Sequence, residues 1–205
     1  MTHTHYSQGP ERPQLILASG SPYRRECLQK LRLPFTCQSP DIDETPQTDE
    51  SVEAMTRRLA TQKAEAIALS HPQTWVIGSD QSASFQGAPL GKPHTYDRAL
   101  EQLRHFSGQT VTFFTALTLI TPQGRWEGLD QTQVRFRHLD DRSLRAYLLS
   151  EEPYDCAGSF KSEGLGITLF ESIQTSDPNA LIGLPLIQLT GFLREAGLAL
   201  PLDPD

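Results

Sequence analysis

Apolar positions along the chain form short continuous runs in some segments and helical stripes in others. Residues 15–18 (LILA) form a run that predicts a buried strand, and Ser21 and Pro22 soon after it are typical of a helix start. Farther on, SVEAMTRRLATQKAEAIALSH carries apolar or small residues three and four positions apart, which predicts a helix with one buried face. Lys63 lies close to this apolar stripe, so its ammonium must either snorkel to solvent or meet an anion.

Strands and helices alternate along the rest of the chain. The pattern predicts strands at 35–38, 75–78, 109–121, 126–138 and 167–173, and helices at 95–106, 141–149 and 185–196. The strands 109–121 and 126–138 are joined by a PQG turn, which favours antiparallel pairing, and Gly87 indicates a second hairpin. Together these elements predict an α/β fold with a mixed β-sheet.

Composition narrows the class of function. A chain of 205 residues with a net charge of -7 has no long basic stripe, which argues against binding to polymeric nucleic acid or to a membrane surface. The three cysteines are widely spaced and form no CxxC pair, so neither a disulfide framework nor a zinc site is expected. Because no segment resembles a signal peptide or a membrane span, we expect a cytoplasmic protein with a flexible N-terminal extension at residues 1–14.

Two arginines lie in the first turn of the helix that Pro22 begins. The helix dipole and the unpaired backbone N–H groups make this turn a place for anions, yet Arg24 and Arg25 are cations. Beside the hydroxyls of Ser19 and Ser21, an arginine pair is explained if an external anion completes the site, and phosphate is the best geometric match. The alternative is that both arginines are solvated on the surface.

Other charged residues lie in the loops that follow the predicted elements. Asp80 is interpreted as the end of an apolar strand at the sheet edge, and Glu44 lies in the acidic loop DIDETP. Two carboxylates at one cleft could hold a hard divalent cation through oxygen ligands, and one of them could activate a water. The alternatives are a capping role for Asp80 and a solvated Glu44.

Several cations complement these carboxylates. Lys63, Lys92 and Lys161, together with the two arginines, suit a polyphosphate if they gather in one cleft and are ordinary surface if they do not. No P-loop, dinucleotide fingerprint or GxSxG elbow occurs, and no spacing supports a Ser–His hydrolase pair. The residues alone thus predict a soluble α/β protein that binds a phosphorylated small molecule with a divalent ion.

Seven stretches in a fixed order resemble the Maf family of nucleotide pyrophosphatases: LILASGSPYRRECLQKL, DIDETP, RLATQKA, VIGSDQ, GKP, YDCAGSFKSEGLG and DPNALIGLPL. The resemblance implies a single Maf-like domain at 15–200, with a curved mixed sheet flanked by helices. It also implies two lobes around a deep nucleotide-binding cleft, as in inosine triphosphate pyrophosphatases. The implied reaction is hydrolysis of a nucleoside triphosphate between the α and β phosphates, with Mg²⁺ or Mn²⁺.

The resemblance also assigns roles to residues. Asp80 matches the proton acceptor of the family, Glu44 matches the acidic residue associated with the metal, and Tyr23, Gln81 and Glu163 match specificity positions. Asp80 is also expected to be a second metal ligand. The expected phosphate-binding residues are Ser19, Ser21, Arg24, Arg25, Lys63, Lys92 and Lys161.

Within the family, GSDQ and SFKSEG resemble the branch that acts on 7-methyl-GTP. The implied role of that branch is to remove unusual nucleotides from the nucleotide pool. N7-methylguanine is cationic and could stack on the ring of Tyr23. The sequence departs from the branch at two positions, because Tyr23 stands where tryptophan is common and Gly20 replaces the usual threonine. Glu163 could accept the N1 and N2 protons of guanine, for which uracil and thymine have no matching donor pair.

Two alternative functions stay open at this point. One is the dTTP/UTP-type pyrophosphatase of the same family, which typically shows GADT in place of GSDQ. The other is a nucleotide-binding regulator of septum formation and cell division. The expected partner is a small-molecule nucleotide, with no polymeric nucleic acid, no membrane and a homodimer as one candidate assembly.

Overall fold

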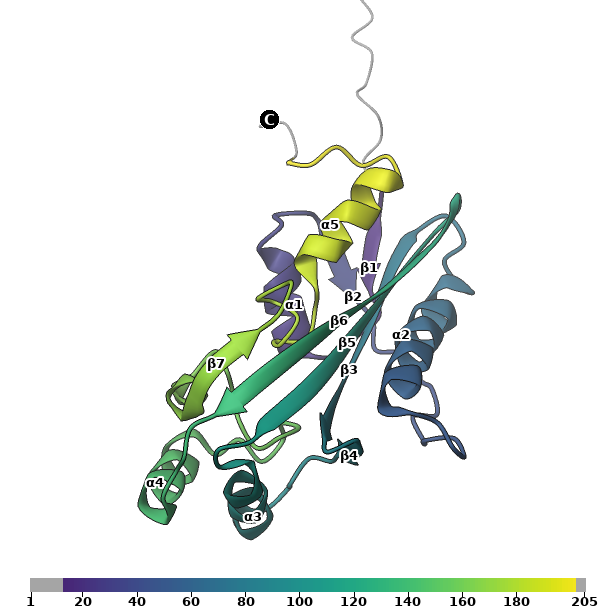
Figure 1. The fold of residues 1–205 in the computed structure, drawn as a ribbon. Helices are drawn as coiled ribbons and strands as arrows, with labels where there is room; N and C mark the ends of the chain where they lie inside the picture. Colours follow the sequence, from purple (N-terminus) through teal and green to yellow (C-terminus); the bar gives the residue numbers. More distant parts are fainter. Residues whose placement is uncertain (1–12, 202–205) are drawn as a thin grey trace, which may run out of the picture.

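A mixed seven-stranded sheet forms the centre of the computed structural model, which describes residues 13–201 (Figure 1). The strand order is β2-β1-β3-β5-β6-β7, and β4 pairs with β3. β1 runs parallel to β2 and β3, whereas the other pairs are antiparallel, which confirms the predicted mixed sheet. The strands are β1 (Leu15–Leu17), β2 (Phe35–Cys37), β3 (Trp75–Phe85), β4 (Ala88–Leu90), β5 (Thr110–Thr121), β6 (Gly124–Phe136) and β7 (Phe170–Gln174).

Helices cover both faces of the sheet, with α2 on one side and α1 and α5 on the other (Figure 1). β5 is buried on both faces, because Leu117 and Leu119 pack with the α5 core and Ile120 packs with Ala64 and Ile67 of α2. The helices are α1 (Pro22–Gln29), α2 (Val52–Ala68), α3 (Tyr96–Phe106), α4 (Asp141–Glu151), the short 3₁₀ helix η1 (Leu165–Leu169) and α5 (Leu186–Glu195).

Two large hydrophobic cores correspond to the two predicted lobes. One core packs α3 and α4 against the sheet and contains edge-to-face aromatic pairs, in which Phe136 contacts both Phe160 and Phe170. The other packs β1 and α1 against the leucines of α5. The curved mixed sheet links the two cores, as the sequence predicts.

Two predicted strands differ from the observed ones. The predicted strand at 75–78 continues to Phe85, so Asp80 lies inside β3 and not at its end. The strand continues beyond the apolar run because β5 pairs with β3 as far as Ser84, and the buried Ser79 hydroxyl donates to the Ala116 carbonyl. The predicted strand at 167–173 begins only at Phe170, since η1 occupies the preceding turn.

Two statements about the ends of the chain stay predictions. The predicted extension at 1–14 falls almost entirely on residues 1–12, which lie outside the described residues, and a single domain at 15–200 is an expectation from sequence. Within residues 13–201, no helix has the length and apolar character needed to cross a bilayer.

Gly78 lets α2 approach β3 closely. A Cβ at this position would lie 2.3 Å from the Ala60 carbonyl oxygen, so the helix must move if any side chain is added. We expect Gly78→Ala to destabilise the fold by about 1–3 kcal/mol. Gly191→Ala in α5 is the matched control, because nothing lies within 4 Å of its added Cβ, and it should stabilise the helix by up to ~1 kcal/mol. Urea unfolding measures both, and an unchanged midpoint for Gly78→Ala would contradict the close approach.

Candidate active site

A cleft of about 490 Å³ opens beyond the carboxyl end of β1. β1 pairs with β3 only as far as Ile77, so the next residues of β3 have no strand beside them on that edge until β4 begins. The cleft is lined by residues from all seven motifs that carry the family resemblance, and RLATQKA in α2 contributes only Lys63. Of the predicted site residues, it brings together Ser19, Ser21, Tyr23, Arg24, Glu44, Lys63, Asp80, Gln81, Lys92 and Glu163.

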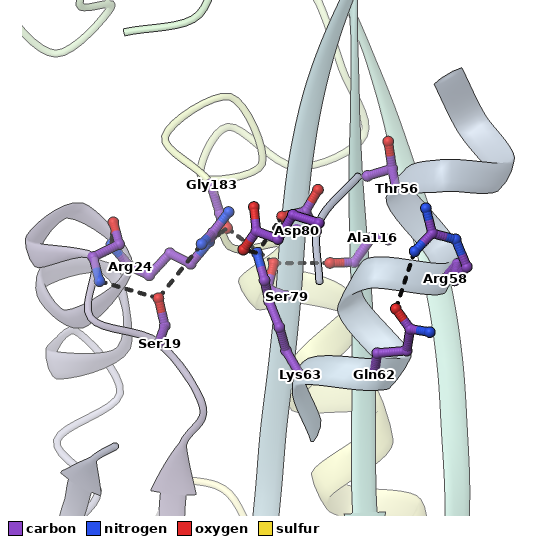
Figure 2. A network of polar contacts seen from close by, with 12 residues as sticks. Ser19, Arg24, Thr56, Arg58, Gln62, Lys63, Ser79, Asp80, Ala116 and Gly183 are labelled. Atoms are coloured by element: carbon purple, nitrogen blue, oxygen red, sulfur yellow. Dashed lines mark hydrogen bonds and ion pairs between the residues drawn. The ribbon is translucent and has the colours of Figure 1, made fainter. Parts of the chain in front are cut away.

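Arg24 points from α1 into this cleft (Figure 2). Ser21 caps the helix by accepting from the Arg24 backbone N–H at 3.4 Å, as the sequence predicts. The guanidinium donates from Nε to the Gly183 carbonyl at 2.9 Å and from Nη1 to Ser19 Oγ at 3.4 Å. Burial lowers the pKa of Arg24, and the charges of Asp80 and Glu44 oppose that effect. An anion in the cleft would meet a guanidinium whose position is already set.

Arg25 does not line this cleft. Arg25 is exposed and lines a second hollow, which adjoins the cleft because residues 19–22 line both. Successive residues of a helix point about 100° apart, so the two arginines leave α1 in different directions. Of the two, only Arg24 lines the cleft, and a role for Arg25 on the same phosphate stays a prediction.

Lys63 joins the two predicted acidic residues. Its Nζ lies 2.6 Å from Asp80 Oδ1 and 2.8 Å from Glu44 Oε1. The side chains of Lys63 and Asp80 are each 9% exposed, whereas Glu44 is 58% exposed at the mouth of the cleft. Of the two alternatives that the sequence leaves for this ammonium, snorkelling to solvent or meeting an anion, the structure shows the second. The other oxygen of Asp80 makes no hydrogen bond to the protein within residues 13–201.

Lys92 and Lys161 have different surroundings. Lys92 is exposed on the rim of the cleft, where it can reach a bound anion. Lys161 is not among the lining residues, and its Nζ donates to the Glu151 carbonyl at 3.2 Å, at the carboxyl end of α4. A cation there complements the negative end of the helix dipole, so the structure places Lys161 in a stabilising contact of α4.

Acidic and aromatic groups line another part of the cleft. Tyr23, Gln81 and Glu163, the three predicted specificity positions, all line the cleft, and Asp155, Cys156 and Glu163 lie close enough to Tyr23 to affect its pKa. Burial is the main cause that raises the pKa of Tyr23 to about 12, with Cys156, Asp155 and Glu163 adding to it. Sequence reasoning missed Asp155 and Cys156 because their loop has no periodicity; their place in the motif YDCAGSFKSEGLG was the available signal.

The raised pKa of Tyr23 predicts how stability depends on alkaline pH. The folded protein keeps the phenol neutral up to about pH 12, whereas the unfolded chain ionises it near 10.0. The stabilisation is therefore complete below pH 10 and is lost as the pH rises to about 12. We expect Tyr23→Phe to flatten the fall in unfolding free energy across this interval, measured by urea titration. Parallel curves for the two proteins would show that the phenol is not buried among these groups.

The fold places this chain in a known structural class. A HAM1 protein from Coxiella burnetii superposes with a TM-score of 0.52 at 16% sequence identity, over 90% of this chain and 100% of that one. The Staphylococcus aureus Ham1 protein superposes with a TM-score of 0.52 at 14% identity, over 89% of this chain and 99% of that one. At this level of identity the likeness defines the fold, and the predicted two-lobed α/β architecture is confirmed.

Sequence comparison then gives the family. The model of the family described as Maf-like protein matches residues 14–196, and this chain belongs to that family. A protein of Hydrogenovibrio crunogenus is 55% identical over 191 residues, covering 92% of this chain and 96% of the relative. One of Pseudomonas aeruginosa is 53% identical over 191 residues, covering 92% of this chain and 100% of the relative. Both relatives are named 7-methyl-GTP pyrophosphatase.

Proposed function

We propose that this protein hydrolyses 7-methyl-GTP to 7-methyl-GMP and pyrophosphate. The observation that carries the proposal is the position of Asp80, a buried carboxylate that lines the same cleft as Arg24 and Lys63 and keeps one oxygen without a protein partner. A carboxylate beside two cations can accept a proton from water while the cations hold a polyphosphate. The name shared by the relatives supports the choice of nucleotide.

Asp80, Lys63 and Arg24 each have a separate role in the proposed hydrolysis. Asp80 takes a proton from a water whose oxygen forms a bond to the α phosphorus. The bond from that phosphorus to the α–β bridging oxygen breaks, and pyrophosphate leaves with the bridging oxygen and its electron pair. Lys63 holds Asp80 at 2.6 Å and fixes its orientation. Arg24 neutralises charge that develops on the phosphate oxygens, and Lys92 on the rim adds to the cationic end of the cleft.

A divalent cation, Mg²⁺ or Mn²⁺, is part of this proposal. Among residues 13–201, no three His, Cys, Asp or Glu side chains are grouped closely enough to hold a metal by themselves. Mg²⁺ is commonly bound through one or two carboxylates together with substrate phosphates, and Glu44 and Asp80 are the carboxylates of the cleft that would hold it. Lys63 Nζ already contacts one oxygen of each, so the ion would depend on their remaining oxygens and on the phosphates. The ion would neutralise phosphate charge when bound with the nucleotide.

In this proposal the nucleobase binds beside Tyr23 and the acidic residues Asp155 and Glu163. N7-methylation makes guanine cationic, and a cationic ring is favoured next to Tyr23, Asp155 and Glu163 by stacking and by charge. Glu163 is exposed and accepts from the Ser162 hydroxyl at 3.1 Å, so its carboxylate can turn toward the N1 and N2 donors of guanine.

Product analysis tests the proposed reaction. Purified protein incubated with 7-methyl-GTP and Mg²⁺ is expected to release one pyrophosphate for each 7-methyl-GMP formed, as separated by ion-exchange chromatography. Release of inorganic phosphate and 7-methyl-GDP would place cleavage at the β–γ bond and contradict the proposal. Tight binding of the nucleotide with no turnover would instead favour a nucleotide-binding regulator.

A further inference from the structure

One loop, residues 177–183, accepts hydrogen bonds through its backbone carbonyls from two residues that line the cleft, Arg24 and Gln81. The Gly183 carbonyl accepts from Arg24 Nε at 2.9 Å and from the Ser79 hydroxyl at 3.0 Å (Figure 2). The Ala180 carbonyl accepts from Gln81 Nε2 at 2.8 Å and from the Thr115 hydroxyl at 2.9 Å. The position of this loop therefore sets the position of Arg24 and Gln81.

These contacts determine which way the Gln81 amide faces. Its nitrogen donates to the carbonyls of Ala180 and Leu181, at 2.8 and 3.0 Å, and to Thr115 Oγ1 at 3.1 Å. Backbone carbonyls only accept hydrogen bonds, so the atom that faces them must be the amide nitrogen. The Gln81 oxygen then lies on the other side of the amide and accepts no hydrogen bond from the protein within residues 13–201, in a residue that lines the cleft. It can accept from an N–H group of a bound base.

The loop is held by a buried polar cluster whose residues do not line the cleft. Asp177 is fully buried and accepts from the Asn179 backbone N–H at 2.8 Å. Its other oxygen accepts from the N–H of Ile187 in the first turn of α5, where Pro185 offers no capping side chain. The first turn of α5 and the loop therefore share one carboxylate as their hydrogen-bond acceptor.

Thr175 connects the backbone of Asp177 to a second buried carboxylate, that of Asp130. Its hydroxyl accepts from the Asp177 backbone N–H at 3.1 Å and lies 2.9 Å from the Asp177 carbonyl and 3.0 Å from Asp130 Oδ1. Asp130 is 1% exposed, and its partners within the described residues are the hydroxyls of Thr132, Thr175 and Ser176. Such a network keeps its geometry only while every member is paired.

We propose that Asp130, Thr175 and Asp177 are positioning residues that select the base by holding the loop against Gln81, so that the amide presents its oxygen to the ligand. This inference rests on the proposed function. Guanine carries adjacent N1 and N2 donors, which can satisfy both the Gln81 oxygen and the Glu163 carboxylate. Uracil has one N–H donor between two carbonyl acceptors, so an inward-facing oxygen disfavours it. Freeing the amide to turn would weaken this discrimination.

A pair of variants at Thr175 tests the proposal. Thr175→Val removes the hydroxyl but keeps the shape, and it is expected to lower the kcat/KM ratio of 7-methyl-GTP to UTP by about three- to tenfold. Thr175→Ser keeps the hydroxyl and should restore the wild-type ratio. In a Gln81→Leu background, Thr175→Val should change the ratio no further, because the amide through which it acts is gone.

Equal slowing of both nucleotides by Thr175→Val, or an undiminished effect in the Gln81→Leu background, would overturn the proposal, because the cluster would then serve folding alone. Asp130→Asn takes the place of Thr175→Val if that variant does not fold, with the same expected fall. Dissociation constants for 7-methyl-GMP and UMP give the ratio without turnover. If the wild type hydrolyses neither triphosphate, the proposed function fails, while the binding ratio still decides whether the cluster positions Gln81.

Discussion

Asp80→Asn is expected to lower kcat by about two to four powers of ten, because an amide has nearly the shape of the carboxylate but cannot accept a proton from water. The variant should still fold, since Lys63 keeps its contact with Glu44 at 2.8 Å. It should also bind nucleotide, because Arg24 and Lys63 stay in the cleft with one fewer negative charge beside them. Steady-state kinetics and a melting curve on the same preparation separate lost chemistry from lost fold.

The control for this variant makes the same chemical change at an exposed site. Asp97 lies in the first turn of α3, outside the cleft, and Asp97→Asn should leave kcat within a factor of about two. A kcat for Asp80→Asn within about threefold of the wild type would remove Asp80 from the role of proton acceptor.

Arg24→Gln and Arg25→Gln are expected to differ sharply, although the two arginines are neighbours. Loss of Arg24 removes a charge-assisted contact to phosphate worth ~1.5–3 kcal/mol, which corresponds to about a ten- to hundredfold fall in kcat/KM. Arg25 lies outside the cleft, so its replacement should change kcat/KM by less than about twofold.

Stability should separate the same two variants. Arg24→Gln loses the hydrogen bond to the Gly183 carbonyl, whereas Arg25→Gln only relieves repulsion between a cation and the amino end of α1. The melting temperature is therefore expected to fall for the first and to stay level or rise for the second. Equal losses of kcat/KM at both positions would show that the arginines act together after all.

Local rules account for the parts of the site that the sequence predicted. Ser21 and Pro22 begin α1 as expected, because capping and the fixed φ of proline depend only on adjacent residues. Lys63 could be recognised as needing an anion because helical periodicity put it beside the apolar face of α2. Its partner Asp80 is 17 residues away, and only the family motif connected the two.

Tertiary contacts account for what the sequence could not show. The Gly183 carbonyl that fixes Arg24 is 159 residues away along the chain, and no local rule pairs a side chain with so distant a carbonyl. The polar residues that follow Gly78 predict a strand end at Asp80, yet pairing with β5 continues to Ser84 and pairing with β4 includes Phe85. The motif of Lys161 predicts a phosphate ligand, but its Nζ donates to the Glu151 carbonyl at the carboxyl end of α4.

The most direct test of the account is a comparison of kcat/KM for 7-methyl-GTP, GTP, UTP and dTTP with Mg²⁺ under identical conditions. A cleft that joins a cationic phosphate end to Tyr23, Asp155 and Glu163 predicts that 7-methyl-GTP is hydrolysed best, ahead of GTP, with UTP and dTTP slowest. If UTP or dTTP is turned over faster than 7-methyl-GTP, the protein is the pyrimidine-specific type of Maf pyrophosphatase, and the assignment of these residues to a methylated guanine is contradicted.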